Sequence, residues 1–471
     1  MYSPFSKPIG QLVTKDLSVL KNLLEGWSIE YKREMIKAEK IAKSVASFAN
    51  TDGGWLFFGV EEPGKACESN KFPGIPKTKI HINKQQIAQA VSQHINPTPS
   101  FYIRVLDGPC NEINLKEDSS IIAVQVPYSN RTPHIQLHDG VIYQRTSDHS
   151  EPVPQTNRFQ LDLLWQRGEE IRESVHQWVA NDPEFTPNEK DIPYFRLLFL
   201  VDPWMPIPET WVKADRTEVK EILNGSSTDE LRIKFDTVHT YQEGYLCRQF
   251  SCGQPVHYGL TFQVFQDLRC ELNVPLDILE VDDFDNGLSI DGEGYVHKGY
   301  YCHILEEQNH KSSRIVNLNF VWANTVAAIS KYLKFLKLAH IRPAFRFKAK
   351  LLNVSRAVPF IDSKVVIDYC ETHGLPMVMH RDLEFPSGSG VHSFFQIEES
   401  EQHDITSRQG TRVFIQFLRS IGIEVTDRYE ELLPDLNKIL QRASDEQTLW
   451  RFLQEDNEDG DEDDDWAPPR L

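Results

Sequence analysis

The clearest hydrophobic pattern in the chain lies between residues 35 and 49. Its apolar positions follow a spacing of three and four residues: Ala38, Ile41, Ala42, Val45, Phe48 and Ala49. Lysines at positions 37, 40 and 43 fall on the other side. This spacing predicts an amphipathic helix with one face in a core. Asp-Gly-Gly at 52–54 ends it, because glycine tolerates the backbone angles of a helix end and a tight turn.

A short alternating segment, Ser28–Lys32, precedes this helix and predicts a strand. Alternate side chains of a strand point to opposite faces. Glu30 and Lys32 therefore share one face, while Ile29 and Tyr31 point to the core. The pattern thus places an acid and a base side by side at the start of the domain.

Further apolar runs predict the remaining elements of the first domain. A buried strand is expected over 55–60, further strands over 102–106, 121–126 and 141–145, and a second helix over 84–95. Strands and helices folded on one mixed sheet give the α+β class, with the domain ending near residue 153.

Beyond residue 155 the hydrophobic pattern is less regular, and we divide this part of the chain into segments. A helical pattern over 159–179 precedes a proline-rich joint, and strand-like and helical runs alternate beyond it. We expect a first domain over 1–155, a linker helix over 156–190, a mixed α/β domain over 191–355, a smaller α/β region over 356–455 and an acidic disordered tail over 456–471. The tail carries too little apolar surface to form a core.

The formal net charge of −19 is unevenly distributed. Residues 1–160 carry 18 Lys and Arg against 16 Asp and Glu, which is +2, whereas residues 161–471 carry 32 against 53, which is −21. Nine of the later acids fall within 455–465. The first domain is therefore the place where a polyanion is expected to bind.

Composition limits the class of protein. No apolar run approaches the length of a membrane span, and we expect no signal peptide, no anchor and no membrane partner. The seven cysteines lack a disulfide rhythm, which predicts reduced thiols and a cytoplasmic location. Cys247, Cys252, Cys270 and Cys302 are too widely spaced to indicate a zinc site, so we expect buried free cysteines.

The acid and base of the first strand are candidates for chemistry. Mg²⁺ and Mn²⁺ prefer oxygen ligands and take one or two carboxylates plus substrate phosphate. Glu25 and Glu30 can supply carboxylates, and Lys32 can stabilise the charge that develops on an attacked phosphodiester. The alternative is a surface ion pair between Glu30 and Lys32, which contributes little.

Three motifs carry a resemblance to a known family. They are the order Glu-x4-Glu-x-Lys from Glu25 to Lys32, Ala-Ser-Phe-Ala-Asn-Thr-Asp-Gly-Gly-Trp-Leu-Phe-Phe-Gly-Val-Glu-Glu over 46–62, and Val-Ile-Tyr-Gln-Arg-Thr-Ser over 141–147. Together they resemble the Schlafen AlbA-like domain. The resemblance covers residues 10–155, a third of the chain, and nothing comparable marks the rest.

The resemblance implies two kinds of function. Schlafen proteins that cleave transfer or ribosomal RNA hold a metal with two glutamates and an aspartate, which correspond here to Glu25, Glu30 and Glu62. The third position departs from the aspartate of those relatives by one methylene. Other relatives are described only as nucleic-acid-binding domains, and membership of a fold does not decide between the two.

Cationic residues in or beside the predicted sheet are candidates for phosphate contacts. They are Lys32, Arg33, Arg104, Arg131 and Arg145. Arginine suits bidentate contacts with phosphate, although each of these residues fits a solvated sheet face equally well. Asn50 is expected to cap its helix, and His134 to be a polar loop residue at the surface.

A second basic tract lies in the acidic part of the chain. It comprises Lys331, Lys334, Lys337, Arg342, Arg346, Lys348 and Lys350. It can extend a nucleic-acid channel or receive the acidic tail, but a solvated helix face followed by an exposed strand face is the favoured interpretation.

The leading hypothesis is a Schlafen-like endoribonuclease that uses Mg²⁺ or Mn²⁺ on structured RNA such as transfer RNA, in defence against phage or in a stress response. The alternatives are a non-catalytic module that binds RNA or DNA, and a protein-interaction scaffold whose acidic region mimics nucleic acid. Animal Schlafens pair two related lobes and this chain has one recognisable copy. We therefore favour a homodimer over a second wall formed by the remaining residues.

Overall fold

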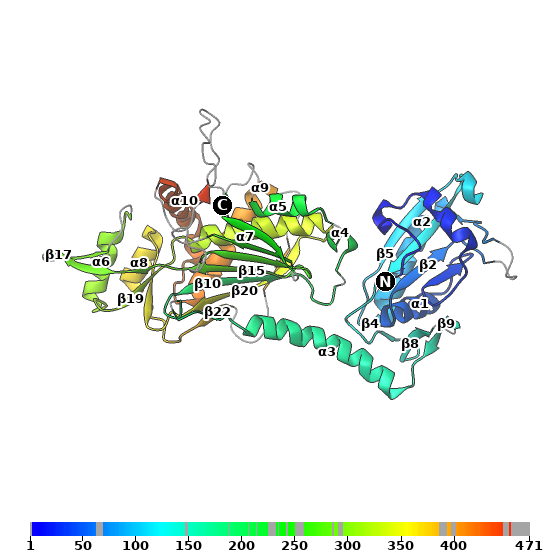
Figure 1. The fold of residues 1–471 in the computed structure, drawn as a ribbon, viewed down its shortest axis with the longest axis horizontal. Helices are drawn as coiled ribbons and strands as arrows, with labels where there is room; N and C mark the ends of the chain where they lie inside the picture. The colour runs from blue at the N-terminus through cyan, green and yellow to red at the C-terminus, as the bar shows by residue number, and fades with distance from the viewer. Residues whose placement is uncertain are drawn as a thin grey trace, which may run out of the picture. The chain divides into compact units, whose positions relative to one another are not determined.

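The computed structural model describes residues 2–62, 69–146, 149–187, 189–205, 207–212, 214–224, 232–233, 235–241, 244–249, 259–284, 287–290, 295–385, 393–396, 402–445 and 452–453. The fold is α+β, as predicted (Figure 1). It forms two compact units, of which the first comprises Met1–Trp178 and Asp202–Glu209 and the second comprises Val179–Val201 and Thr210–Leu471. The predicted acidic tail lies outside the described residues.

A five-stranded sheet forms the centre of the first unit. Its strands are β1 (Ile29–Lys32), β2 (Gly54–Phe58), β3 (Ile75–Pro76), β5 (Tyr102–Asp107) and β6 (Ser119–Val126). In the described residues, β1 pairs with β2 in parallel, β2 pairs with β6 antiparallel, and β3 and β5 share the other edge of β6. Glu30 lies opposite Leu56 in this register.

Each face of this sheet has its own core. Helices α1 (Ala38–Asn50) and α2 (Ile80–His94) cover one face, with Phe48 and Ile87 packed against Leu56 and Val124. Both helices begin a few residues from their predicted starts. The 3-10 helices η1 (Ile9–Gln11) and η2 (Thr14–Asn22) belong to the other face, where Trp55 and Phe57 of β2 are buried. Further 3-10 turns are η3 (Lys77–Lys79) and η4 (Asn111–Ile113).

The prediction of a single sheet in this domain is wrong. A second sheet comprises β4 (Ile95–Asn96), β7 (Ile135–Gln136), β8 (Val141–Thr146) and β9 (His149–Pro154). The side-chain amide of Asn50 donates to the carbonyls of His134 (2.8 Å) and Tyr143 (3.0 Å), so that this sheet is tied to the end of α1. The last turns of α1 are buried as a result, including the polar residues Ser44, Ser47 and Asn50.

Helix α3 (Arg158–Ala180) confirms the helical pattern predicted over 159–179. It packs on the loop before β7, because the Thr132 hydroxyl donates to the carbonyl of Leu164 at 2.6 Å. Trp204 also donates its indole N–H to the carbonyl of Gly168 at 3.3 Å. Most of the segment predicted as a linker thus belongs to the first unit.

The second unit contains an eight-stranded sheet among its described residues. Its strands are β10 (Tyr194–Leu200), β12 (Thr237–Tyr241), β13 (Gly244–Arg248), β14 (Thr261–Phe265), β15 (Cys270–Pro275), β20 (Ala344–Leu352), β22 (Leu383–Phe385) and β23 (Ser393–Gln396). Because β20 pairs with both β22 and β23, residues on either side of position 355 share one sheet. The division predicted at 355/356 is therefore wrong.

Smaller strand pairs and helices complete this part of the chain. The strands are β11 (Arg232–Ile233), β16 (Ile278–Leu279), β17 (Val281–Phe284), β18 (Gly287–Ile290), β19 (Arg314–Asn317), β21 (Ala357–Phe360) and β24 (Phe452–Leu453). The helices beyond residue 200 are α4 (Glu209–Val212), α5 (Arg216–Asn224), α6 (Lys298–Glu307), α7 (Val321–Leu338), α8 (Lys364–His373), α9 (Gln402–Ser420) and α10 (Tyr429–Asp445), with a 3-10 turn η7 (Thr426–Arg428).

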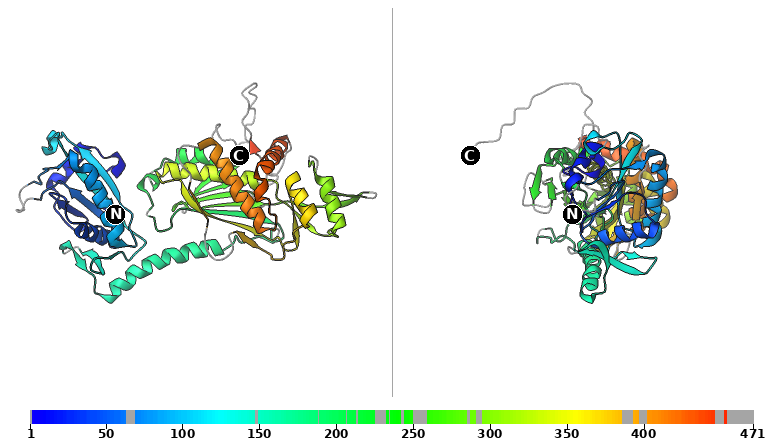
Figure 2. Two further views of the ribbon diagram at one scale, coloured as in Figure 1. Left: turned by 180° about the vertical axis from the view of Figure 1, so that it is seen from behind. Right: turned by 90° about the vertical axis from the view of Figure 1, so that its right-hand side faces the viewer.

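Helices α7 and α9 lie along one face of the large sheet (Figures 1 and 2). Aromatic rings fill this interface: Phe199 of β10 stacks on Tyr332 of α7, with ring centroids 5.1 Å apart. Phe195 meets Phe417 of α9 edge-on at 5.2 Å. The apolar residues of β10 thus form the core between sheet and helices.

The other face of this sheet carries a network of charged side chains, which we call the sheet network. It consists of Asp182, Arg196, Glu271, Lys348, Lys350 and Glu384. Arg196 binds both carboxylate oxygens of Glu271, at 2.9 and 3.0 Å. Lys350 contacts Asp182 at 2.9 Å and Glu384 at 3.3 Å. The network thus pairs three cations with three carboxylates, so its formal charges cancel.

The basic tract was expected to lie on exposed faces, and for three of its members this is wrong. Lys348 and Lys350 are buried in the sheet network. Lys331 is buried under α5, where its ammonium donates to the carbonyl of Leu223 at 2.7 Å. A lysine that is buried with its partners supplied by the protein is part of the core and cannot line a channel.

Candidate nucleic-acid interface

Glu30 lies in the middle of β1 and is 6% exposed. Its carboxylate accepts a hydrogen bond from the Ser44 hydroxyl of α1 at 3.0 Å and forms an ion pair with Arg145 of β8. Lys32 approaches its Oε1 atom to 2.9 Å. Burial alone would raise the pKa of Glu30, but Arg145 and then Lys32 reverse the effect, and the pKa lies below its ordinary value. Glu30 is therefore an ionised, fully partnered carboxylate.

Arg145 is held on every side. Its Nε donates to the Ser47 hydroxyl at 3.2 Å, its Nη1 to the carbonyl of Gly26 at 3.3 Å, and its guanidinium lies 3.9 Å from the ring centroid of Phe48. The backbone N–H of Arg145 donates to the Thr51 hydroxyl at 2.9 Å. The side chain is 0% exposed, so it joins β8, α1 and the turn before β1 instead of facing solvent.

Glu25 and Glu62 meet beside this ion pair. The backbone N–H of Glu25 donates to Oε1 of Glu62 at 2.8 Å, and Oε1 of Glu25 accepts the backbone N–H of Tyr31. The Lys32 ammonium lies 3.7 Å from Oε1 of Glu25. Glu25, Glu30, Lys32 and Glu62, which we call the acid–lysine group, therefore gather from three separate segments at one place.

The three carboxylates do not fit a metal ion as these side chains lie. Glu30 already accepts from Ser44, Lys32 and Arg145. Across the described part of the chain, no three His, Cys, Asp or Glu side chains form a group that could hold an ion. Glu25 and Glu62 use Oε1 for the contacts given above. Binding of Mg²⁺ or Mn²⁺ at Glu25, Glu30 and Glu62 stays a prediction.

The residues predicted to contact phosphate do not come together. Arg33 is exposed and pairs with Glu61 at 3.0 Å. Arg104 donates twice to the carbonyl of Leu12, at 3.2 and 3.3 Å, and its guanidinium helps to hold the N-terminal segment. The guanidinium of Arg131 is exposed and lies 5.6 Å from the ring centroid of Trp204. Arg145 is buried, so Lys32 is the only one of these five predicted phosphate contacts that belongs to the acid–lysine group, and Arg33 is its neighbour in sequence.

The sequence did not identify several polar residues that hold the site. Ser44 and Ser47 lie on the buried side of α1. Their position on an otherwise apolar helix face could have indicated that they bind a polar partner in the core. His134 is 0% exposed, contrary to the expected surface position. Its Nδ1–H donates to the carbonyl of Pro97 and its Nε2 accepts the Ser129 hydroxyl at 2.8 Å. Burial lowers the pKa of His134 to about 4, so it is neutral near pH 7.

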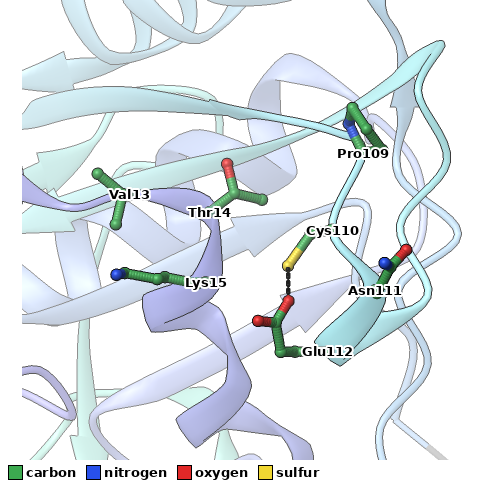
Figure 3. Close-up of a pocket in the computed structure, with 7 residues that line it drawn as sticks. All are labelled: Val13, Thr14, Lys15, Pro109, Cys110, Asn111 and Glu112. Atoms are coloured by element: carbon green, nitrogen blue, oxygen red, sulfur yellow. Dashed lines mark hydrogen bonds between the residues drawn. The ribbon is translucent and has the colours of Figure 1, made fainter.

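A separate open pocket lies by the start of η2 (Figure 3). Its volume is 480 Å³, and it is lined by Val13, Thr14, Lys15, Pro109, Cys110, Asn111 and Glu112. The Cys110 thiol donates to Glu112 at 3.1 Å. Burial, and then this hydrogen bond, raise the pKa of Cys110, so the sulfur remains a thiol near pH 7. The pocket contains no residue of the acid–lysine group.

The five cysteines among the described residues, Cys110, Cys247, Cys270, Cys302 and Cys370, are free and buried, as predicted. Cys252 lies outside the described residues. None of the helices in the described parts of the chain has the length and apolar content that a membrane span requires.

Glu25 gives a prediction about pH. Burial raises the pKa of Glu25, and Glu30 and Glu62 add to the effect, so folding favours its protonated form. Glu25→Gln should therefore raise the free energy of unfolding near pH 7. The gain should shrink as the pH falls through the raised pKa and vanish below the ordinary value of 4.5. Urea unfolding at a series of pH values measures it, with exposed Glu34→Gln as control. A gain that grew toward low pH would contradict this assignment.

Comparisons with known proteins find a similarity within the first unit. Residues 25–154 match the family model described as Schlafen, AlbA_2. No curated protein matches the chain. Among solved structures, the N-terminal domain of a putative ATP-dependent DNA helicase RecG-related protein from Nitrosomonas europaea is similar, at 17% identity and a TM-score of 0.20. That match covers 31% of this chain and 93% of that one.

Proposed function

We propose, on the premise that residues 25–154 are a Schlafen AlbA_2 domain, that the first unit of this chain binds nucleic acid. The observation that carries the proposal is the match of residues 25–154 to that family, and Glu25, Glu30, Lys32 and Glu62 lie together in the matched segment. Folded RNA such as transfer RNA is the proposed partner, in the cytoplasm, and a homodimer is the proposed assembly. Shape and phosphate contacts should dominate recognition, because side chains cannot read the deep, narrow major groove of RNA.

Binding is favoured over cleavage by the state of Glu30. A carboxylate that neutralises a buried arginine maintains the fold, and moving it toward an ion would weaken its ion pair with Arg145. The interactions of Glu30 are therefore those of a residue that positions Lys32 and α1. Such a role requires no chemistry at this carboxylate.

Metal-dependent cleavage of RNA, in defence or in a stress response, is the second candidate. It is supported by Glu25 and Glu62, which lie side by side at the rim of the group and each contact the protein through Oε1. Two carboxylates plus substrate phosphate are a common ligand set for Mg²⁺. Glu25 and Glu62 would hold the ion, and the ion would supply a Lewis acid for the scissile phosphate. Lys32 would place a positive charge beside that phosphate.

One experiment on the full chain with transfer RNA distinguishes binding alone from metal-dependent cleavage. We expect binding whose logarithmic affinity falls linearly with the logarithm of salt concentration, as phosphate contacts require. Adding Mn²⁺ or Mg²⁺ then tests cleavage. Product formed by wild type and by Glu61→Gln, but not by Glu62→Gln, would support the second candidate. Intact RNA with wild type under both metals would reject cleavage and leave binding. Absent or salt-independent binding would reject the first candidate.

Glu62 is a sharper test position than Glu30. Glu61 and Glu62 are neighbours, both partly exposed, and Glu61 pairs only with exposed Arg33 in the contacts given above. Replacing Glu30 would instead remove the carboxylate that pairs with the buried Arg145, so a loss of activity could result from unfolding as well as from lost chemistry.

A further inference from the structure

The acid–lysine group is not by itself a surface that attracts a polyanion. Three carboxylates, Glu25, Glu30 and Glu62, are offset there by two cations, Lys32 and the buried Arg145. The group together with Arg145 is therefore negative by one charge, which disfavours the approach of phosphates. If the first unit binds nucleic acid, the attraction must come from another part of it.

The two helices on one face of the first sheet carry a concentrated positive charge. Residues 37–50 and 77–94, which include α1 and α2, hold six lysines and one acid, Glu39, which is +5. Residues 1–160 as a whole have a charge of +2. The rest of that segment is thus negative by three, so the net positive charge of residues 1–160 comes from α1, α2 and the residues just before each helix.

Three lysines at the start of α1 have no acidic partner among the described residues. Lys37 and Lys40 are exposed, Lys43 is half-buried, and among the described residues no carboxylate forms an ion pair with any of them. Lys43 lies 4.6 Å from the ring centroid of Tyr143 on β8, which fixes its stem against the second sheet. At spacings of three residues they form one stripe along the outer side of the helix.

Helix α2 continues the surface with side chains suited to a nucleic-acid backbone. It packs beside α1, and Gln86 donates to the carbonyl of Ile36 at 3.1 Å just before Lys37. Its exposed residues include Lys84 and a stripe of glutamines at i, i+4 and i+8: Gln85, Gln89 and Gln93. Amide side chains both donate and accept hydrogen bonds, which matches sugar hydroxyls and phosphate oxygens.

We propose that this surface, the helix face formed by Lys37, Lys40, Lys43 and Lys84 with the three glutamines, is where the first unit holds the backbone of a nucleic acid. The inference rests on the proposed function and assigns its contact surface. Helix α1 joins this face to the acid–lysine group, since Ser44 follows Lys43 directly and donates to Glu30. RNA bound along α1 would thus lie beside Lys32.

The test measures transfer RNA binding by the full chain across a salt series, using Lys37→Gln, Lys40→Gln and Lys43→Gln combined. Each lost phosphate contact lowers the slope of logarithmic affinity against logarithmic salt by about 0.7–0.9, so the slope should fall by about 2, with an affinity loss of roughly tenfold or more at low salt. The matched control is Lys15→Gln, Lys71→Gln and Lys116→Gln, which removes the same charge from exposed positions beside the other core of the sheet.

The outcomes separate this inference from the proposed function. A reduced slope in the α1 variant and an unchanged slope in the control support the helix face. Equal losses in both variants would overturn it, because the effect would then follow net charge alone. Salt-dependent binding by wild type that the α1 variant retains in full would overturn the helix face and keep the proposed function. Absent binding by wild type would overturn both.

Discussion

Arg145→Met should destabilise the first unit by about 3–5 kcal/mol, the usual cost of removing one member of a buried ion pair. The substitution removes the cation beside Glu30, whose side chain is only 8% exposed, and releases Ser47 and the carbonyl of Gly26. Hydrogen exchange resolved by peptide measures the effect. Protection should fall in β1, α1 and β8 and stay unchanged in α7 of the second unit.

Two further variants identify the cause of the loss. Arg131→Met removes an exposed arginine of the same unit and should change the free energy of unfolding by less than about 0.5 kcal/mol. Combining Arg145→Met with Glu30→Leu removes both charges, and most of the lost stability should return, since apolar replacements of a whole buried pair are often neutral. A double variant as unstable as Arg145→Met would attribute the loss to packing and contradict the ion-pair account.

Arg196→Met should have a comparable effect in the second unit. Arg196 is the only residue of the sheet network that binds both oxygens of Glu271 in the contacts given above, and its side chain is 3% exposed. The substitution leaves Glu271, which is 10% exposed, facing methionine, and a destabilisation of about 3–5 kcal/mol is expected. Protection from hydrogen exchange should fall in β10, β15 and β20, while α1 of the first unit keeps its protection.

Arg346→Met on β20 is the matched control for this second result. Arg346 is half-buried, and no ion pair involves it among the described residues. Its loss should cost about 1 kcal/mol or less. If both variants lost protection equally, the sheet network would not be what stabilises β10, and the cost would reflect the loss of any long side chain from this sheet.

Local patterns predicted the elements of the first unit well. The three- and four-residue spacing over 35–49 gave α1, and the alternation over Ser28–Lys32 gave β1 with Glu30 and Lys32 on one face. These predictions succeed because amphipathic periodicity reflects burial within a single element. The place of Glu62 in the acid–lysine group was expected only from the family resemblance, since Glu62 approaches Glu25 from 37 residues away.

The missed features all depend on partners that are distant in sequence. Arg145 resembles an exposed arginine of a strand until α1 and the buried carboxylate of Glu30 cover it. Lys348 and Lys350 alternate with apolar residues and so suggest a half-exposed strand, yet Glu384 and Asp182 supply their counter-charges. A sequence pattern records which side of a strand is polar, but not whether the polar side is covered.

The ion pair between Glu30 and Arg145 also bears on how the chain acquires its structure during synthesis. The segment β1–α1–β2 is complete by Phe58, and its contacts are local, so it can form early. Arg145 lies 115 residues after Glu30, so until β8 emerges the carboxylate of Glu30 has only Lys32 and Ser44 of its own segment as partners. A fragment cut before β8 would therefore keep the motifs around Glu30 and lose its buried counter-ion.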